Sequence, residues 1–288
     1  TILAQTTEKM KRLLDIELQK LWKNRASKVL IIAYFVLLSF IALIASIKFE
    51  FGTFKLHIAE QGIFNFPYIW HFNTYIAAIL KFFLAIVIVS MMANEYTYGT
   101  LKQNLIDGFS KKEFIQSKFL TVLVFALAST VFVFIMSLLL GLSFSSYNEV
   151  SIIFSDLEYI LAYFLKLTAF FSFCLFLGIL VKRSAFAIGF LFVWNIIEGI
   201  IIGILKWNVF KNSDDYEKIT QFLPLESMSN LIKEPFTRLS VIKNIEETIG
   251  GQANSKDYGV HWYSMLIVVC WIVIFVLMSY KILQKRDL

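Results

Sequence analysis

Charged residues are scarce in this chain of 288 residues. They make up 17% of it, and hydrophobic residues make up 58%, whereas soluble domains have about 25% and 45–50%. This balance excludes an ordinary soluble enzyme. The chain also has only three prolines and twelve glycines, which excludes disordered and collagen-like chains and favours long helices. The two cysteines, Cys174 and Cys270, lie inside apolar runs and have no metal-ligand or C-x-x-C spacing, so we interpret both as packing residues.

Several motifs of catalysis and nucleotide binding are missing as well. No G-x-x-x-x-G-K-[ST] occurs, so the chain has no phosphate-binding loop of its own. The three histidines, His57, His71 and His261, are not at H-E-x-x-H spacing, and there is no G-x-S-x-G. We therefore expect no catalytic residues, no metal site and no cofactor bound by this chain itself. Any ATP that it uses must be bound by another subunit.

Long apolar runs dominate what is present. Windows of about 19 residues identify six candidate membrane spans, each able to cross a hydrocarbon core of about 30 Å as a helix. The sequence therefore predicts an all-α polytopic membrane protein with a single transmembrane domain over residues 1–288. The six predicted spans are residues 29–47, 75–94, 119–142, 159–181, 184–205 and 260–280.

The basic residues between these spans predict the orientation. Sixteen lysines and arginines fall on one side if both termini are cytoplasmic, as expected from the excess of positive charge in cytoplasmic loops. The long segment 206–257 then lies outside the cytoplasm and is acidic overall. Because topology accounts for the positive net charge, we expect membrane lipids as partners and no nucleic acid.

Two flanking segments have amphipathic character. In the opening segment, residues 1–28, apolar residues recur at helical spacing with lysines around them, although Ile16 and Glu17 interrupt the pattern. This predicts a helix that lies along the inner membrane surface or packs on a cytoplasmic partner. The first outer loop, residues 48–74, is crowded with aromatic residues, which predicts an aromatic belt at the lipid headgroups.

The cytoplasmic segment between spans two and three, residues 95–118, is the most informative. A glycine turn precedes Leu101, Leu105 and Ile106, which are at helical spacing, and Asp107-Gly108 marks a second break. Ser110 followed by Glu113 forms a capping-box pattern. The segment is expected to form two short helices joined by a sharp turn; the alternative is a plain solvated loop. Glu95 is expected to pair with Lys102 or with a basic residue of the opening helix.

This segment resembles a known signature. Glu95, then Gly99-Thr100-Leu101, then Ser110-Lys111-Lys112 and finally Lys118 resemble the E…GTL…SR…K pattern of type-2 ATP-binding-cassette permeases. Two departures are Asp107-Gly108, where many members have a proline, and Lys111 in place of arginine. The resemblance implies that residues 99–106 form a coupling helix that docks on the ATP-binding subunit. The coupling residues that it implies are Glu95, Gly99, Thr100, Leu101, Lys102, Leu105, Ile106, Ser110, Lys111 and Lys112.

The resemblance extends to the overall plan. Phe222-Leu223-Pro224-Leu225 resembles the entry to a short re-entrant outer helix before span six. The implied function is the permease subunit of an exporter in the bacterial inner membrane, as a homodimer or paired with a similar subunit, with ATP and Mg bound by separate ATP-binding subunits. The substrate does not follow from the sequence. Two alternatives remain open, an ATP-driven scaffold that acts on a partner protein without transport, and an ATP-independent channel or carrier.

Ionisable residues also interrupt the spans. Lys81, Lys166 and Glu198 are each predicted to lie about 10 Å below the outer end of a span, and thus in one layer. A charge at that depth is costly, so each is a functional candidate. We expect Glu198 to pair with one of the lysines beside Asn195, forming a gate or a substrate-contacting layer. The alternative is that each lysine snorkels to the outer headgroups.

Overall fold

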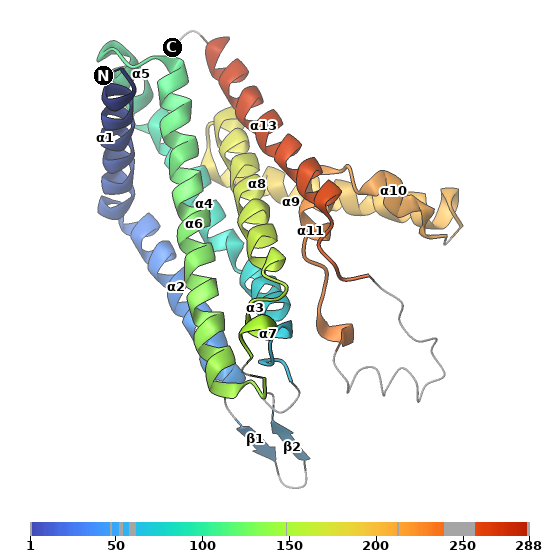
Figure 1. Cartoon of the computed structure of the whole chain (residues 1–288). Coiled ribbons are helices and arrows are strands. Elements are labelled where there is room, and N and C mark those ends of the chain that lie inside the picture. The colour runs from blue at the N-terminus through green and yellow to red at the C-terminus, as the bar shows by residue number, and fades with distance from the viewer. Residues whose placement is uncertain are drawn as a thin grey trace.

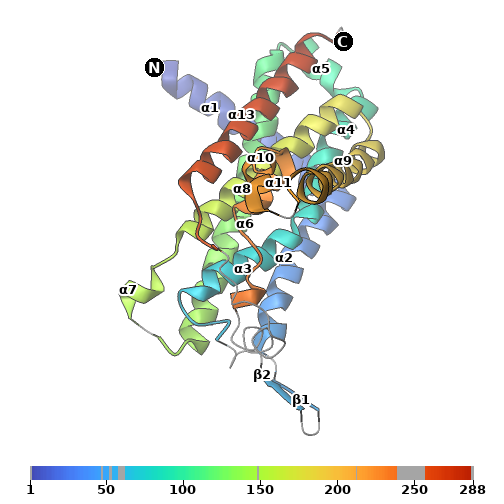
Figure 2. The ribbon, with the colours of Figure 1, turned by 90° about the vertical axis from the view of Figure 1, so that its right-hand side faces the viewer.

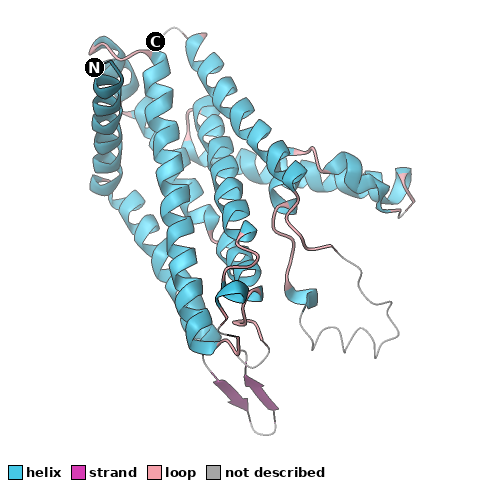
Figure 3. Ribbon diagram, viewed as in Figure 1, coloured by secondary structure: helices cyan, strands magenta, loops and turns pink. Residues whose placement is uncertain are grey.

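A computed structural model describes residues 2–46, 48–51, 54–57, 62–147, 149–211, 213–238 and 257–286 of the chain. It is a bundle of helices with both termini at one end (Figure 1). The short helix α5 (Thr100–Ile106) lies at that same end. At the opposite end lie the four-residue helix α7 (Val150–Ile153) and an antiparallel hairpin of strands β1 (Lys48–Phe51) and β2 (Phe54–His57). Figure 3 shows how nearly helical the described chain is, which agrees with the predicted all-α class.

Four helices are long and apolar enough to cross a membrane among the described residues, and a bent pair would make a fifth span. The predicted first span coincides with α2, in which Tyr34 and Leu38 are fully buried, although nothing is described of its side chains from residue 41 on. Helices that coincide with predicted spans are α2 for the first span and α6, α8, α9 and α13 for the last four. Their bounds are α2 (Arg25–Ser46), α6 (Lys111–Phe144), α8 (Glu158–Val181), α9 (Ser184–Ile204) and α13 (Trp262–Gln284).

The central helix of the bundle is α8. It packs against α4, α6, α9 and α13, and most of its side chains are buried, as expected for a helix that is hydrophobic on all sides. The Tyr163 hydroxyl lies 3.0 Å from that of Tyr34 on α2. Gly178 allows α8 and α4 to approach closely, because an added Cβ would lie 2.9 Å from Cβ of Met92 on α4. The core of the protein therefore lies around α8.

The predicted second span is not one straight helix. It consists of α3 (Tyr68–Ile79) and α4 (Lys81–Thr97), which meet at Leu80 with a bend of 44°. At the break, the Leu80 amide donates to the Ala77 carbonyl at 3.1 Å, an i→i−3 bond in place of the α-helical one. The helical structure also begins seven residues before the predicted start, because the aromatic residues that precede it are packed into the bundle.

These aromatic residues correct the prediction of an aromatic belt. Phe64, Phe66 and Trp70 are almost completely buried and belong to the core. The Trp70 ring stacks on Phe134 at a centroid distance of 5.3 Å, and its indole nitrogen donates to the Ile153 carbonyl at 2.8 Å. These three residues therefore hold α3 against α6 and α7 and do not anchor the protein to headgroups. The side chains of residues 48–61 lie outside the described part.

The helix α9 leaves the bundle. It runs at a wide angle to α8 in Figure 1 and is seen nearly end-on in Figure 2. It continues into a π-helical turn, η2 (Leu205–Val209). Only 11% of the most apolar 18 residues in the helical segment 184–209 are buried, compared with 78% in the segment 150–181 that contains α8. A helix of this composition without protein cover must be covered by lipid or by another protein chain.

The predicted outer segment is folded where it is described. It contains η3 (Asp214–Tyr216), α10 (Glu217–Thr220), α11 (Pro224–Asn230) and η4 (Phe236–Arg238). Helix α11 starts with a proline, which suits the first helical position, and it packs on α8, α9 and α13. A short helix before Pro235 is thus confirmed. Residues 239–256 of this segment lie outside the described part.

Candidate functional site: a buried charge cluster beside α5

Four charged side chains meet near the end of the bundle that carries both termini. Glu17 and Lys20 come from α1 (Ile2–Lys23), Glu95 from the last turn of α4 and Lys118 from α6. Lys118 Nζ lies 2.5 Å from Glu17 Oε2 and 2.6 Å from Glu95 Oε1. Lys20 Nζ lies 2.9 Å from Glu95 Oε1 and 3.5 Å from Glu17 Oε1. We call these four residues the charge cluster.

The charge cluster is buried and neutral overall. The Lys118 side chain is fully buried, and Glu17 and Glu95 are about as inaccessible, whereas 38% of the Lys20 side chain is exposed. Burial lowers the pKa of Lys20, but the carboxylates of Glu17 and Glu95 outweigh burial, and the net shift of this pKa is upward. Two carboxylates balance two ammonium groups, so no charge is left uncompensated. Removing one partner of such a pair leaves a buried charge, which costs about 3–5 kcal/mol.

A sharp turn connects the charge cluster to α5. Gly99 has φ +67°, which is left-handed, and no atom lies within 4 Å of where its Cβ would stand. Glycine is therefore favoured here by the backbone conformation, whereas a larger side chain would meet no steric clash. The next residue, Thr100, donates its hydroxyl hydrogen bond to Glu95 Oε2 at 2.5 Å. Glu95 thus holds α1, α5 and α6 at once.

Helix α5 has one attached face and one exposed face. Leu101 is buried against the bundle, and Leu105 is half-buried. In contrast, Tyr98 and Ile106 are more than 70% exposed, and Lys102 is also exposed. The expected pairing of Glu95 with the opening helix is confirmed by Lys20, whereas Lys102 does not take part. The exposed surface of α5 and of the turn before it offers two large apolar groups and one positive charge.

The capping box is confirmed, but the second short helix is not. Ser110 Oγ accepts the Glu113 amide at 3.1 Å, and Glu113 Oε2 accepts the Ser110 amide at 3.0 Å. The helix that starts there is α6, which continues for 34 residues to Phe144. At 1.5 Å per residue this is about 51 Å, longer than a hydrocarbon core. The first turns of α6, which follow α5 in the sequence, therefore belong to the same helix as the predicted third span.

The remaining predicted coupling residues differ in their surroundings. Lys112 is exposed, whereas Lys111 Nζ donates to the carbonyls of Gln284 (3.2 Å) and Arg286 (2.8 Å) near the end of the chain. Arg286, which the sequence analysis did not single out, donates to the Tyr96 hydroxyl at 2.8 Å and to the Ile179 carbonyl at 2.6 Å. The residues after α13 are thus tied to α4, α6 and α8.

Glu198 does not pair with a lysine as predicted. It accepts hydrogen bonds from the backbone amides of Leu225 (3.0 Å to Oε2) and Glu226 (3.0 Å), and from the indole nitrogen of Trp194 (2.6 Å). The amides at the start of α11 have no partners within that helix, so a carboxylate there is favourable. Glu198 is therefore an anchor for α11.

The other members of the predicted layer also surround α11. Lys166 Nζ approaches the carbonyls of Ser229 (3.5 Å) and Ile232 (3.4 Å) at its far end, where a positive charge suits the helix dipole. Lys81 and Asn195 line one cavity of about 170 Å³ with residues of α11. There Lys81 Nζ lies 4.3 Å from the centroid of the Phe170 ring, a cation–π contact. The four predicted residues are brought together, but around a helix and without the predicted ion pair.

A second polar cluster, missed by sequence reasoning, joins the outer segment to the bundle. His71 stacks on Tyr159 at 4.3 Å between centroids. Its Nε2 lies 2.8 Å from the Lys233 carbonyl and its Nδ1 lies 3.0 Å from an Arg238 guanidinium nitrogen. The arginine also lies over the Tyr68 ring, at 5.1 Å from its centroid. Within the described part of the chain, no three His, Cys, Asp or Glu side chains gather where they could hold a metal ion.

Comparison with known proteins gives a family. Residues 29–288 match the family described as proteins of unknown function, DUF2705. The chain belongs to this family. It is also similar to the uncharacterized protein YhcI of Bacillus subtilis strain 168, at 40% identity over 62 residues, which are 22% of the chain. The matched region spans about a fifth of that curated relative. The matched family region begins inside α2, after the α1 residues of the charge cluster.

Proposed function

We propose that this protein is the membrane-spanning subunit of a type-2 ATP-binding-cassette transporter that works as an exporter. In this proposal the chain crosses the bacterial inner membrane six times, with both termini in the cytoplasm. It pairs with a second copy or a similar subunit, and two separate ATP-binding subunits bind ATP and Mg. The chain itself binds lipids around its spans and contributes no catalytic residue.

The charge cluster is the observation that carries this proposal. An ATP-driven transporter needs an element that converts movement of the ATP-binding subunits into movement of the spans. Helix α5 is attached by Glu95 to α1, α4 and α6, and α4 and α6 continue into predicted spans. A force applied to the exposed face of α5 therefore reaches two spans through buried, charge-assisted contacts.

The exposed face of α5 suits a protein partner. Ile106 on α5 and Tyr98 in the turn before it present apolar surface, and Lys102 adds a positive charge; large apolar groups are typical of interface centres. Leu101 is buried, so it supports the fold of α5 and does not contact a partner directly. A test of docking should therefore change exposed residues only.

The test is affinity purification of the tagged full-length protein in mild detergent, followed by identification of the proteins that stay bound. We expect an ATPase with a Walker motif in the wild-type sample. The double variant Lys102→Glu/Ile106→Glu should lose it while its thermal unfolding midpoint stays unchanged. The control Lys281→Glu/Lys285→Glu reverses two exposed charges at the end of α13 and should keep the ATPase. A folded wild-type protein that never retains an ATPase would contradict the proposal.

A further inference from the structure

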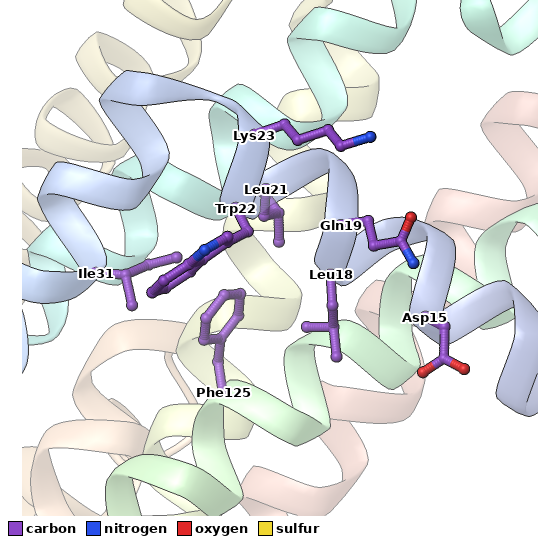
Figure 4. A pocket seen from close by; sticks show the side chains of 8 residues that line it. All are labelled: Asp15, Leu18, Gln19, Leu21, Trp22, Lys23, Ile31 and Phe125. Carbon is purple, nitrogen blue, oxygen red and sulfur yellow. The ribbon is translucent and has the colours of Figure 1, made fainter.

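A large apolar groove lies between α1, the start of α2 and α6. It has a volume of about 520 Å³. Five apolar side chains from the three helices gather in it, whereas the ammonium end of Lys23 lies away from them (Figure 4). The five are Leu18, Leu21, Trp22, Ile31 and Phe125.

The edge of this groove is strongly basic. The junction of α1 and α2 carries Lys23, Arg25 and Lys28, with no acidic residue between positions 21 and 28. Lys20 belongs to the charge cluster and does not count toward this edge. Lys28 Nζ lies 5.0 Å from the centroid of the Trp22 ring, so a positive charge stands directly over one wall of the groove. Asp15 is the one acidic residue among those that line the groove.

We propose that this groove binds an anionic phospholipid, with an acyl chain among the five apolar side chains and the phosphate on Lys23 and Lys28. The orientation of the proposed function puts the junction at the cytoplasmic membrane surface, where anionic headgroups are present. A groove that is apolar inside and basic at its edge matches both parts of such a lipid, whereas a zwitterionic lipid adds to its phosphate a cationic group that the basic edge repels. The site rests on the proposed membrane orientation but not on the ATPase partner.

The lipid site shares α1 with the charge cluster. Leu18 and Leu21 line the groove, whereas Glu17 and Lys20, each one residue away, contact Glu95 and Lys118. The residues that line the groove and those that hold α5 therefore lie on different faces of the same turn of α1. A bound lipid fixes the position of α1 and thereby stabilises the charge cluster. The anionic lipid is thus a regulator of the proposed coupling between α5 and the spans.

The first test measures lipid retention by native mass spectrometry of the full-length protein with phosphatidylglycerol or phosphatidylcholine added. We expect phosphatidylglycerol to be retained at least fivefold more. Lys23→Gln/Lys28→Gln should abolish this preference, and Leu18→Trp, which fills the groove without changing charge, should reduce retention by a similar factor. The control Lys281→Gln/Lys285→Gln removes two exposed charges at the same end of the molecule and should keep the wild-type preference. Equal retention of both lipids by the wild type would overturn the proposal.

A second measurement tests the position of the acyl chain directly. Phosphatidylglycerol with a brominated acyl chain should quench tryptophan fluorescence more in the wild type than in Trp22→Phe. Equal quenching would place the acyl chain outside the groove and overturn the proposal. Retention of an ATPase is scored separately in each sample. A protein that binds an ATPase but shows no lipid preference contradicts the lipid site alone, and the converse contradicts the transporter alone.

Discussion

Lys118 is the residue whose loss should harm the protein most. It is fully buried between Glu17 and Glu95, and among the described lysines it alone lies within 3 Å of both carboxylates. Lys118→Met should therefore lower the free energy of unfolding by about 3–5 kcal/mol, because it leaves a buried negative charge uncompensated. Denaturant unfolding in detergent, followed by tryptophan fluorescence, measures this loss. Lys281→Met, at an exposed position of α13, is the control. Equal stability of the two variants would show that the charge cluster contributes little.

Gly99 should be sensitive for a different reason. A Cβ at this position meets no neighbour, but φ of +67° is strained for an L-residue by about 1–2 kcal/mol. Gly99→Ala is therefore expected to destabilise the protein by about that amount, and Gly99→Asn by less, because asparagine enters this region more readily. Gly189→Ala in α9 also meets no neighbour but has helical geometry, so it should be neutral or slightly stabilising. The unfolding midpoints of the three variants provide the comparison.

At the residue scale, the sequence predicted charges better than partners. The signature located Glu95, Gly99 and Lys118 in one segment, and the expected contact of Glu95 with the opening helix is present. Glu17 was noted only as an interruption of an apolar pattern. A carboxylate on the apolar face of an amphipathic helix is itself a signal of a buried ion pair, since it is too costly there alone. The partner of Glu198 was predicted incorrectly, because backbone amides of a distant helix have no sequence signature.

Among the elements, α11 provides the sharpest prediction. Glu198 accepts two backbone amides at the start of this helix, and hydrogen bonds to a charged group contribute about 1.5–3 kcal/mol. Glu198→Gln keeps the shape but removes the charge, so hydrogen exchange of the Leu225 and Glu226 amides should accelerate by about tenfold. Mass spectrometry of peptides that cover residues 223–230 measures the rate. Glu149→Gln, at an exposed position before α7, should leave the rate unchanged, and an unchanged rate in Glu198→Gln would contradict the anchoring role.

Element type was largely predictable, and element shape was not. Hydropathy located a helix at each of the six long apolar segments, because burial in a membrane or in a core requires the same continuous run. The helices α3 and α6 nevertheless begin seven and eight residues before the predicted starts. The bend at Leu80 has no proline or glycine to announce it. The burial of Phe66 depends on contact with Gly141, 75 positions later, where an added Cβ would lie 2.2 Å from its ring. Such contacts are tertiary, so local patterns do not contain them.

For the whole molecule, the exposure of α9 indicates where a second subunit would bind. Ile196 is 60% exposed on α9 and Leu127 is 55% exposed on α6. The two side chains are thus about equally accessible but lie on different helices. In a Cys270→Ser background, which removes the exposed cysteine, Ile196→Cys should form a disulfide-linked dimer on mild oxidation, and Leu127→Cys should not. Non-reducing gel electrophoresis of membranes reads this out. Cross-linking through Leu127→Cys alone would place the interface on α6 and leave α9 to lipid.

The overall arrangement of the helices was only partly predictable, because it also depends on tertiary contacts. The distribution of basic residues predicted that both termini lie on one side, and in the structure both termini lie at one end of the bundle (Figure 1). The direction of α9 away from the bundle could not be predicted, since its apolar composition is the same whether lipid, this chain or another chain covers it.

The charge cluster also constrains how the sequence can change over evolutionary time. Its four members stand at positions 17, 20, 95 and 118, so no single local event alters them together. In a relative that loses the carboxylate at position 17, the lysine at position 118 keeps only one of its two carboxylate partners, the one at position 95. Drift at these sites is therefore expected to proceed in pairs, and relatives that lack an acid at one position should also have changed a lysine at another. An alignment of many relatives would reveal this covariation between segments far apart in the gene.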